Sequence, residues 1–89
     1  MISKSIIVKG KVQGVFFRAS AKRIAESLNL YGWVKNNDNG DVEILVTGNQ
    51  TDIEKFIIWS KTGPEKAKVK EVLVSDSNEI PLHNFKIIN

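Results

Sequence analysis

The dipeptide Asn39-Gly40 narrows the possible folds of this 89-residue chain more than any other part of the sequence. Both residue types accept a positive φ, and they stand between two strand-like segments, residues 33–37 and 41–47. This arrangement predicts a tight hairpin with positive φ at both turn residues. The two segments are then antiparallel neighbours in a sheet, and every other element must be placed around them.

Three more segments have the composition of β-strands, namely residues 3–9, 66–75 and 85–88. The first is β-branched and alternates weakly, and Gly10 is expected to end it. In the second, the apolar positions change phase part-way along, which predicts a β-bulge near Lys70. The third is short and closes the chain.

Two segments have the apolar spacing of amphipathic helices. In residues 17–28 the apolar side chains recur at i, i+3, i+4 and i+7. Asn29 follows, and asparagine tolerates the left-handed backbone conformation that often ends a helix. The second helix is expected to open at a capping box formed by Thr51 and Glu54 and to end before Gly63-Pro64. Its expected core face consists of Ile53, Phe56 and Ile57.

The order βαββαβ with an extra short C-terminal strand predicts an α+β fold, a ferredoxin-like two-layer sandwich. We expect a single domain over residues 1–89, with an antiparallel sheet and both helices on one of its faces. Because strand-helix-strand crossovers are right-handed, the first two strands run parallel and the third lies between them. The loop after the first strand and the C-terminal end of the second therefore share one edge of the sheet.

Composition excludes several classes of site. The chain has no cysteine, which excludes a disulfide scaffold, a thiolate zinc site and a cysteine nucleophile. The single histidine, His83, and scattered acids such as Glu43 and Glu71 lack metal-ligand spacing, so we expect no metal and no cofactor. A net charge of +3 can attract many kinds of anion. No apolar run is long enough to cross a bilayer, and we expect a cytoplasmic protein.

The segment between the first strand and the first helix, residues 10–18, has the character of an anion-binding loop. Gly14 permits a backbone path closed to other residues, and successive N–H groups there can converge on an anion beside the positive helix end. Arg18 adds a planar group that can bind two phosphate oxygens. The alternative is that Gly14 only turns the chain and Arg18 is solvated. Phe16 and Phe17 are expected to plug the core and hold the loop.

Asn36 is a second candidate at the same edge of the sheet. It lies two residues after Val34, so both side chains are expected on the face that the helices cover. The first and second strands would lie roughly 10 Å apart across the third, which leaves room for an arginine, a phosphate and a water. The alternative for Asn36 is a local hydrogen bond in the turn, which is the usual role of asparagine there.

Three stretches of the sequence match one known family. They are Gly10-x-Val12-Gln13-Gly14-Val15-x-Phe17-Arg18, Leu30-x-Gly32-Trp33-Val34-x-Asn36 and Gly40-x-Val42-Glu43. With these stretches the chain closely resembles the acylphosphatases. The similarity continues through Gly48, Trp59, Gly63-Pro64, Ala67, Val69 and Val72 and so covers nearly the whole chain. Some members end in an aromatic or basic residue near the site, whereas this sequence ends in Ile87-Ile88-Asn89.

The resemblance implies an activity and a set of site residues. The implied activity is the metal-independent hydrolysis of the carboxyl-phosphate bond of small acyl phosphates. Arg18 matches the family's phosphate-binding arginine, and Asn36 matches the asparagine that positions the attacking water. The implied phosphate-binding loop comprises Gln13, Gly14, Val15, Phe16, Phe17 and Arg18. We expect a monomer whose partner is a small-molecule acyl phosphate, with no nucleic acid and no membrane among its partners.

Two other functions stay open on the sequence. Lysines at every second position, Lys66, Lys68 and Lys70, are compatible with a nucleic-acid-binding ferredoxin-like domain, but they equally describe the solvated face of a strand. The third strand also lacks the aromatic side chains on which RNA-binding sheets of this type stack bases. The other possibility is a non-catalytic acylphosphatase-like module that binds an anion or a partner, as in larger maturation proteins. The short length of the chain argues against this possibility.

Overall fold

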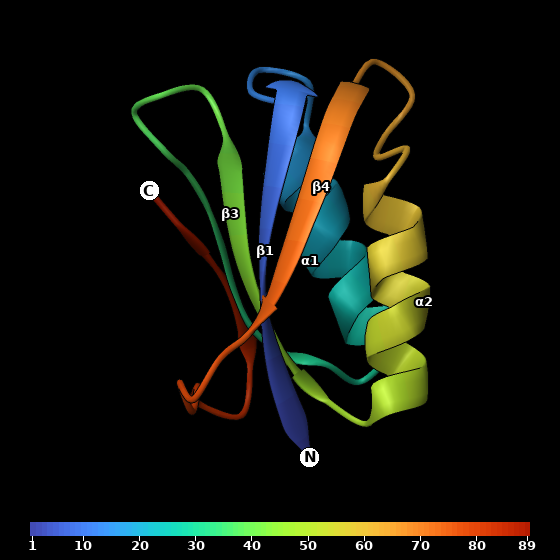
Figure 1. Cartoon of the computed structure of the whole chain (residues 1–89), viewed down its shortest axis with the longest axis vertical. Helices are drawn as coiled ribbons and strands as arrows, with labels where there is room; N and C mark the ends of the chain where they lie inside the picture. Colours follow the sequence, from blue (N-terminus) through green and yellow to red (C-terminus); the bar gives the residue numbers. More distant parts are fainter.

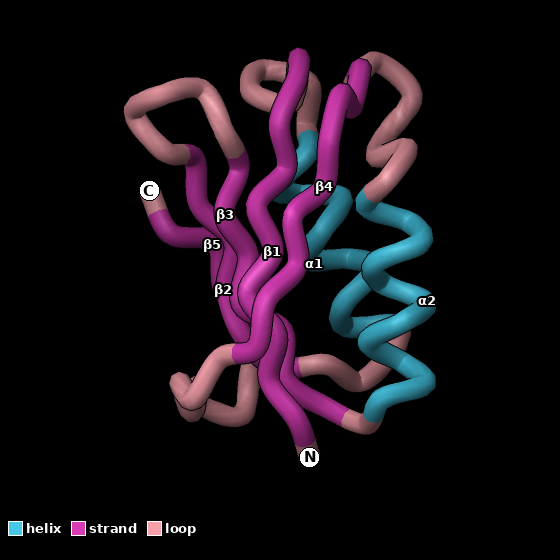
Figure 2. Tube along the Cα trace, in the orientation of Figure 1, coloured by secondary structure: helices cyan, strands magenta, loops and turns pink.

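The computed structural model describes all of residues 1–89 and has two layers, a five-stranded sheet and a pair of helices (Figure 1). The elements in chain order are β1 (Ile2–Lys11), α1 (Phe17–Ser27), β2 (Tyr31–Asn36), β3 (Val42–Gly48), α2 (Gln50–Ser60), β4 (Lys68–Asp76) and β5 (Phe85–Ile88). Both helices cover the same face of the sheet (Figure 2). The predicted ferredoxin-like sandwich with an extra C-terminal strand is therefore confirmed.

The strand order is β4-β1-β3-β2-β5. As predicted, β3 lies between β1 and β2 and is antiparallel to both, so that β1 and β2 run parallel. The expectation of a fully antiparallel sheet is wrong, because β5 pairs with β2 in parallel. The reason is visible in Figure 1: the segment 77–84 carries the chain around the end of the sheet from which β2 starts, and β5 then runs in the direction of β2.

The pairing of β1 with β4 contains the predicted bulge. The register shifts between Lys9 and Gly10, which leaves Lys70 of β4 without a partner. Gly10 does not end the strand, contrary to expectation, because β1 continues to Lys11. The glycine instead permits the bulge, since a Cβ atom at this position would lie only 2.2 Å from the carbonyl oxygen of Lys68.

The two helices follow their apolar patterns but α2 starts differently. Asn49 is its N-cap residue, and the Asn49 side chain accepts a hydrogen bond from the backbone N–H of Asp52 at 2.9 Å. The predicted capping box at Thr51 is therefore wrong, because Asn49 caps the helix two residues earlier. Neither helix has the length and apolar character needed to cross a membrane.

The hairpin between β2 and β3 is present, but its turn is wider than predicted. Asn36 pairs with Val42, so residues 37–41 form the connection. Gly40 has a positive φ of 96°, whereas Asn39 does not have a positive φ. Asn39 instead stabilises the turn with its side chain, which accepts a hydrogen bond from the backbone N–H of Asp41 at 3.0 Å.

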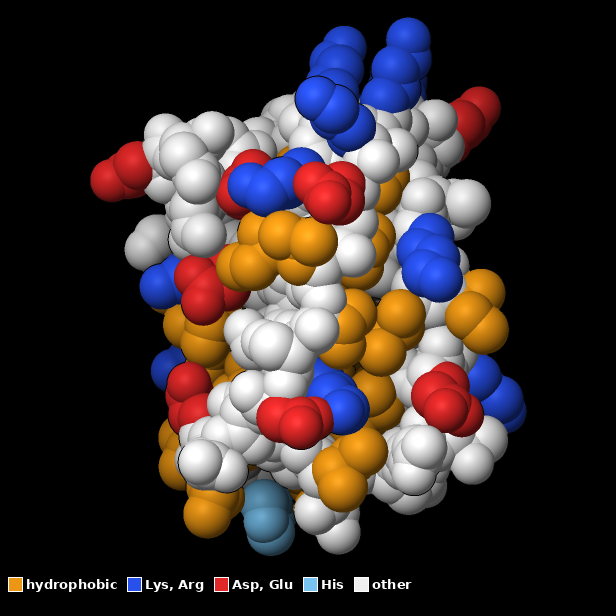
Figure 3. Space-filling model, viewed as in Figure 1, with side chains coloured by type: hydrophobic (Ala, Val, Ile, Leu, Met, Phe, Trp, Pro, Cys, Tyr) orange, Lys and Arg blue, Asp and Glu red, His pale blue; other side chains and the backbone are white.

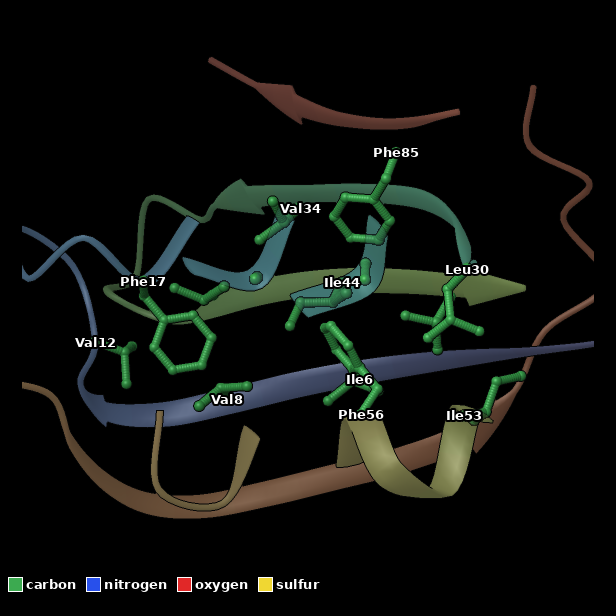
Figure 4. Close-up of a cluster of buried hydrophobic side chains, with 14 of the residues drawn as sticks. Ile6, Val8, Val12, Phe17, Leu30, Val34, Ile44, Ile53, Phe56 and Phe85 are labelled. Atoms are coloured by element: carbon green, nitrogen blue, oxygen red, sulfur yellow. The ribbon is translucent and has the colours of Figure 1, made fainter. Parts of the chain in front are cut away.

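The hydrophobic core fills the space between the sheet and the helices (Figure 4). Strand side chains such as Ile6, Val8 and Ile44 meet Phe17 of α1 and Phe56 of α2, and all of them are buried. Phe17 also packs against the ring of Trp59, with 5.2 Å between the ring centroids. The first residue of α1 is thereby anchored in the core, and the loop that precedes it is held at a defined place.

Candidate active site

A cavity of about 400 Å³ lies where β1 leads into α1, beside the ends of β2 and β5. Its lining brings together Arg18 and Asn36, the two side chains that the sequence suggested. The residues that line it are Val12, Gly14, Phe16, Phe17, Arg18, Ala19, Asn36, Ile87 and Asn89. Figure 1 shows the β1–α1 loop and the β2–β3 hairpin at the same end of the molecule, as the topology predicted.

The loop between β1 and α1 presents free backbone N–H groups. Gly14 and Phe16 both have left-handed φ values, of 74° and 64°. None of the N–H groups of residues 13–16 donates a hydrogen bond within the protein, and no side chain caps the N-terminus of α1. Alternating left-handed residues turn successive N–H groups toward a common concavity, which is suited to an anion.

The left-handed conformation of Phe16 follows from the packing of its neighbours. Val15 and Phe17 are both buried in the core, whereas Phe16 between them is 77% exposed. The expectation that both phenylalanines plug the core therefore holds for Phe17 and is wrong for Phe16. A left-handed φ in a bulky residue costs roughly 1–2 kcal/mol. Such strain persists only where the surrounding packing imposes it, and here two buried neighbours do so.

Gln13 connects the loop to the hairpin. Its side-chain amide donates hydrogen bonds to the backbone carbonyls of Asn37, at 2.8 Å, and Asp41, at 2.9 Å. Gln13 and Val15 are the two predicted loop residues that do not line the cavity. The Gln13 side chain holds the loop through its hydrogen bonds to the hairpin, and the Val15 side chain holds it by packing in the core. The backbone N–H groups of both residues donate no hydrogen bond within the protein.

Arg18 lies in the first turn of α1, where its positive charge opposes the helix dipole. Nη1 of Arg18 donates to Oδ1 of Asn89 at 3.1 Å and to the carbonyl oxygen of Ile88 at 3.5 Å. No acidic side chain lines the cavity, and Arg18 takes part in no salt bridge. The hydrogen-bond partners of the guanidinium are thus neutral oxygens, and no acidic side chain pairs with it.

Asn36 has a buried polar atom without a partner. Its Oδ1 is inaccessible to solvent and accepts no hydrogen bond. The local turn hydrogen bond that was the alternative for this side chain is not formed. A buried acceptor without a donor costs about 1–3 kcal/mol. Because no solvent reaches this oxygen, a ligand or a water can donate to it only when the Asn36 amide turns toward the cavity that the residue lines.

The remaining titratable groups are arranged away from this cavity. His83 stacks on Tyr31 with 4.9 Å between ring centroids, and neither residue lines the cavity. No three side chains of the types His, Asp and Glu converge as they would around a metal ion. The groups available for chemistry in the cavity are therefore backbone N–H groups, Arg18 and two asparagine side chains.

Sequence reasoning missed the contribution of the C-terminal strand. Ile87 and Asn89 line the cavity because β5 lies beside β2, where Ile87 pairs with Val34. The sequence indicated a strand at residues 85–88 but carried no signal for the edge that it would join. Ala19 was missed as well, although its place one residue after Arg18 in the first turn of α1 is a usable signal.

Comparison with known proteins identifies the family. The family model described as acylphosphatase matches residues 4–87. The chain belongs to the acylphosphatase family. An acylphosphatase from Alkalilimnicola ehrlichii is 42% identical over 86 residues, which cover 97% of each chain. Full-length similarity at this level makes the chain an acylphosphatase-type hydrolase.

Two solved structures with this fold differ in the length of their chains. The crystal structure of acylphosphatase from Bacillus subtilis superposes with a TM-score of 0.94 at 39% identity and covers all of both chains. The crystal structure of HypF from T. kodakarensis superposes with a TM-score of 0.88 at 33% identity, but only 12% of that chain is covered. The same unit thus occurs in a chain of similar length and within a much longer protein.

Proposed function

We propose that this chain hydrolyses the carboxyl-phosphate bond of small acyl phosphates without a metal ion, with Arg18 and Asn36 as its catalytic residues. The observation that carries the proposal is that Asn36, whose Oδ1 has no partner, lines the same cavity as Arg18 and the free loop. An acceptor, a cation and a set of N–H donors are the groups that the reaction needs. Membership of the acylphosphatase family supports the reaction class.

The phosphoryl group is bound by residues 13–18. The backbone N–H groups of Gln13, Gly14, Val15 and Phe16 have no acceptor in the protein, and those of Phe17 and Arg18 lie in the uncapped first turn of α1. A bound phosphate would accept hydrogen bonds from this set and would offset the unfavourable position of a cation there. The Arg18 guanidinium binds two of the phosphoryl oxygens.

Asn36 orients the attacking water. When the Asn36 amide turns toward the cavity, its Oδ1 accepts a hydrogen bond from the water and directs a lone pair of the water oxygen toward phosphorus. The bond between phosphorus and the acyl oxygen then breaks, and its electron pair leaves with the carboxylate. The water proton passes to a phosphoryl oxygen, so the products are a carboxylate and inorganic phosphate. Because a carboxylate is a good leaving group, positioning and electrostatic stabilisation can supply most of the catalysis.

The test is the hydrolysis of benzoyl phosphate in the presence of a chelator. We expect Arg18→Ala to lower kcat/KM by about 10²-fold to 10³-fold, because the transition-state charge loses its main partner. Arg18→Lys should also be poor, because an ammonium group lacks the two-pronged geometry. Asn36→Ala should lower kcat by about 10²-fold with a smaller change in KM, because water positioning acts after binding.

Matched controls come from exposed residues of the same types outside the cavity. Arg23→Ala removes the other arginine of α1, and Asn78→Ala removes an exposed asparagine. Both should keep wild-type activity. Full activity in folded Arg18→Ala or Asn36→Ala would refute the assigned role. Phosphate binding without turnover by the wild type would instead favour the non-catalytic binding module.

We further propose that one chain is sufficient for activity. The support is that one chain by itself brings Arg18, Asn36 and the β1–α1 loop to a single cavity. Size-exclusion chromatography combined with an activity assay over a range of protein concentrations tests this. Specific activity should be independent of concentration, and activity confined to a dimer peak would contradict the proposal.

A further inference from the structure

Phe16 combines an unfavourable backbone conformation with an unfavourable side-chain environment. Its φ of 64° is left-handed, and its aromatic ring is 77% exposed. The other loop residue with a left-handed φ is Gly14, which bears no side chain. Packing of Val15 and Phe17 explains why residue 16 points outward, but it does not explain why a large apolar side chain stands there.

The cavity has a polar part and an apolar rim. Arg18, Asn36 and the free N–H groups make up the polar part. Among the apolar residues of the lining, Val12 and Phe17 are almost fully buried. The apolar surface that a ligand can reach therefore belongs to Phe16, Ala19 and Ile87.

The chemistry of the substrate divides in the same way. The phosphoryl group needs donors and a cation, and the acyl group needs neither. When the phosphate is bound by the loop and by Arg18, the acyl group must lie along the part of the lining that donates no hydrogen bonds. Phe16 is adjacent to the loop N–H groups in sequence and lines the cavity with an accessible ring. An aromatic ring there can pack against an apolar acyl group as the latter leaves water.

We propose that Phe16 is a specificity-determining residue that contacts the acyl group and selects acyl phosphates with aromatic or bulky apolar acyl groups. This inference rests on the proposed function. It assigns the Phe16 side chain a role separate from that of its backbone N–H group, which serves the phosphate. Ile87 and Ala19 complete the surface on which the acyl group lies.

The test compares two substrates that carry the same phosphoryl group, benzoyl phosphate and acetyl phosphate. The quantity to measure is the ratio of their kcat/KM values. Weaker binding of the phosphoryl group lowers both values by the same factor, so its effect cancels in the ratio. Phe16→Asn is the first variant, since asparagine tolerates a left-handed φ and the loop can keep its path. Phe16→Leu is the second, since it keeps an apolar side chain without the aromatic face.

We expect wild type to favour benzoyl phosphate. Phe16→Asn should lower the benzoyl-to-acetyl ratio by about threefold to tenfold, which is the range of one aromatic contact. Phe16→Leu should give an intermediate ratio. The inhibition constant of inorganic phosphate, measured in parallel, reports the affinity for the phosphate group alone. It should stay near the wild-type value in both Phe16 variants. Leu82→Asn, at a 71% exposed apolar residue outside the cavity, is the matched control and should leave the ratio at the wild-type value.

The possible failures are distinguishable. If wild type hydrolyses both substrates and Phe16→Asn and Phe16→Leu keep the wild-type ratio, the role of Phe16 is refuted and the proposed function stands. If wild type hydrolyses neither substrate, the proposed function is refuted, and this inference fails with it.

Discussion

Gln13 determines the shape of the cavity without contributing a side chain to its wall. Its amide bridges two backbone carbonyls of the hairpin, those of Asn37 and Asp41, and so holds the β1–α1 loop against the end of β2. The distance between the loop N–H groups and Asn36 depends on this bridge. A residue that the sequence grouped with the phosphate ligands thus has a structural role as well.

Gln13→Ala should lower the free energy of unfolding by about 1–2 kcal/mol, because two part-buried hydrogen bonds are lost, although each carbonyl keeps a backbone donor. It should also raise the inhibition constant of inorganic phosphate, because the loop is no longer tied to the hairpin. Urea unfolding and phosphate inhibition measure the two effects. Gln50→Ala, at the chain's other glutamine, is the control, since Gln50 is exposed at the start of α2. Equal effects of the two substitutions would contradict the role of Gln13.

The N-cap of helix α2 is Asn49, two residues before the Thr51 that the sequence pattern predicted. Asn49→Ala should lower the free energy of unfolding by about 1 kcal/mol, because the N–H of Asp52 loses its acceptor. Thr51→Ala should change it by less than about 0.5 kcal/mol, because Thr51 is exposed within the helix and caps nothing. Thermal or urea unfolding of the two variants decides between the two caps. A larger loss of unfolding free energy in Thr51→Ala than in Asn49→Ala would instead support the capping box at Thr51.

The pairing of β1 with β4 carries a pH-dependent ion pair at its end. A hydrogen bond from Lys4, and next the charge of Lys4, hold the pKa of Asp76 below its ordinary value of 3.8. The carboxylate therefore stabilises the fold at pH values above this ordinary pKa, and the contribution is lost as the pH falls through the lowered pKa. The effect is small because Asp76 is exposed.

Asp76→Asn should accordingly lower Tm slightly at neutral pH and by less in acid, because the contribution of the carboxylate is lost as the pH falls through its lowered pKa. Asp38→Asn, at an exposed acid of the hairpin, should show no such pH-dependent difference. Calorimetry at neutral and at acid pH measures this. A Tm difference for Asp76→Asn that persists undiminished in acid would show that the ion pair is not its cause.

The charge of the molecule is unevenly distributed. Four lysines at the end of β1 and around the start of β4 form no salt bridge, namely Lys11, Lys66, Lys68 and Lys70. Lys11 and Lys68 even face each other across the strand pair, where like charges repel. Figure 3 shows basic side chains gathered at this end of the molecule, the end that also carries the β1–α1 loop. If the cavity is the active site, such a field would raise the local concentration of an anionic substrate.

Replacing Lys11, Lys68 and Lys70 together by glutamine should lower kcat/KM for an acyl phosphate at low salt, by up to about tenfold. The difference from wild type should vanish near 1 M salt, where charges are screened within about 3 Å. The control replaces Arg23, Lys55 and Lys86 by glutamine, which removes the same three charges from the net charge of +3 but elsewhere on the surface. An equal salt dependence of the two triple variants would show that net charge alone acts.

Much of the fold was predictable because it depends on short-range patterns. The spacing of apolar residues predicted both helices, the shift of phase in β4 predicted the bulge at Lys70, and Asn39-Gly40 predicted the hairpin. Two of the errors fall where two local solutions compete. Asn49 and Thr51 are both good caps, and the Asn39 side chain replaced a positive φ with a hydrogen bond.

The sequence alone determined the elements, the order of β1, β2 and β3 and the edge of the sheet at which the site lies, because periodicity, turn chemistry and crossover handedness act locally. Only the tertiary structure decided three further points. They are the parallel docking of β5 beside β2, the exposure of Phe16 and the lack of a partner for Oδ1 of Asn36. Each depends on packing between segments far apart in the chain. Arg18 donates a hydrogen bond to Asn89, 71 positions away in the sequence, and no local sequence pattern predicts such a contact.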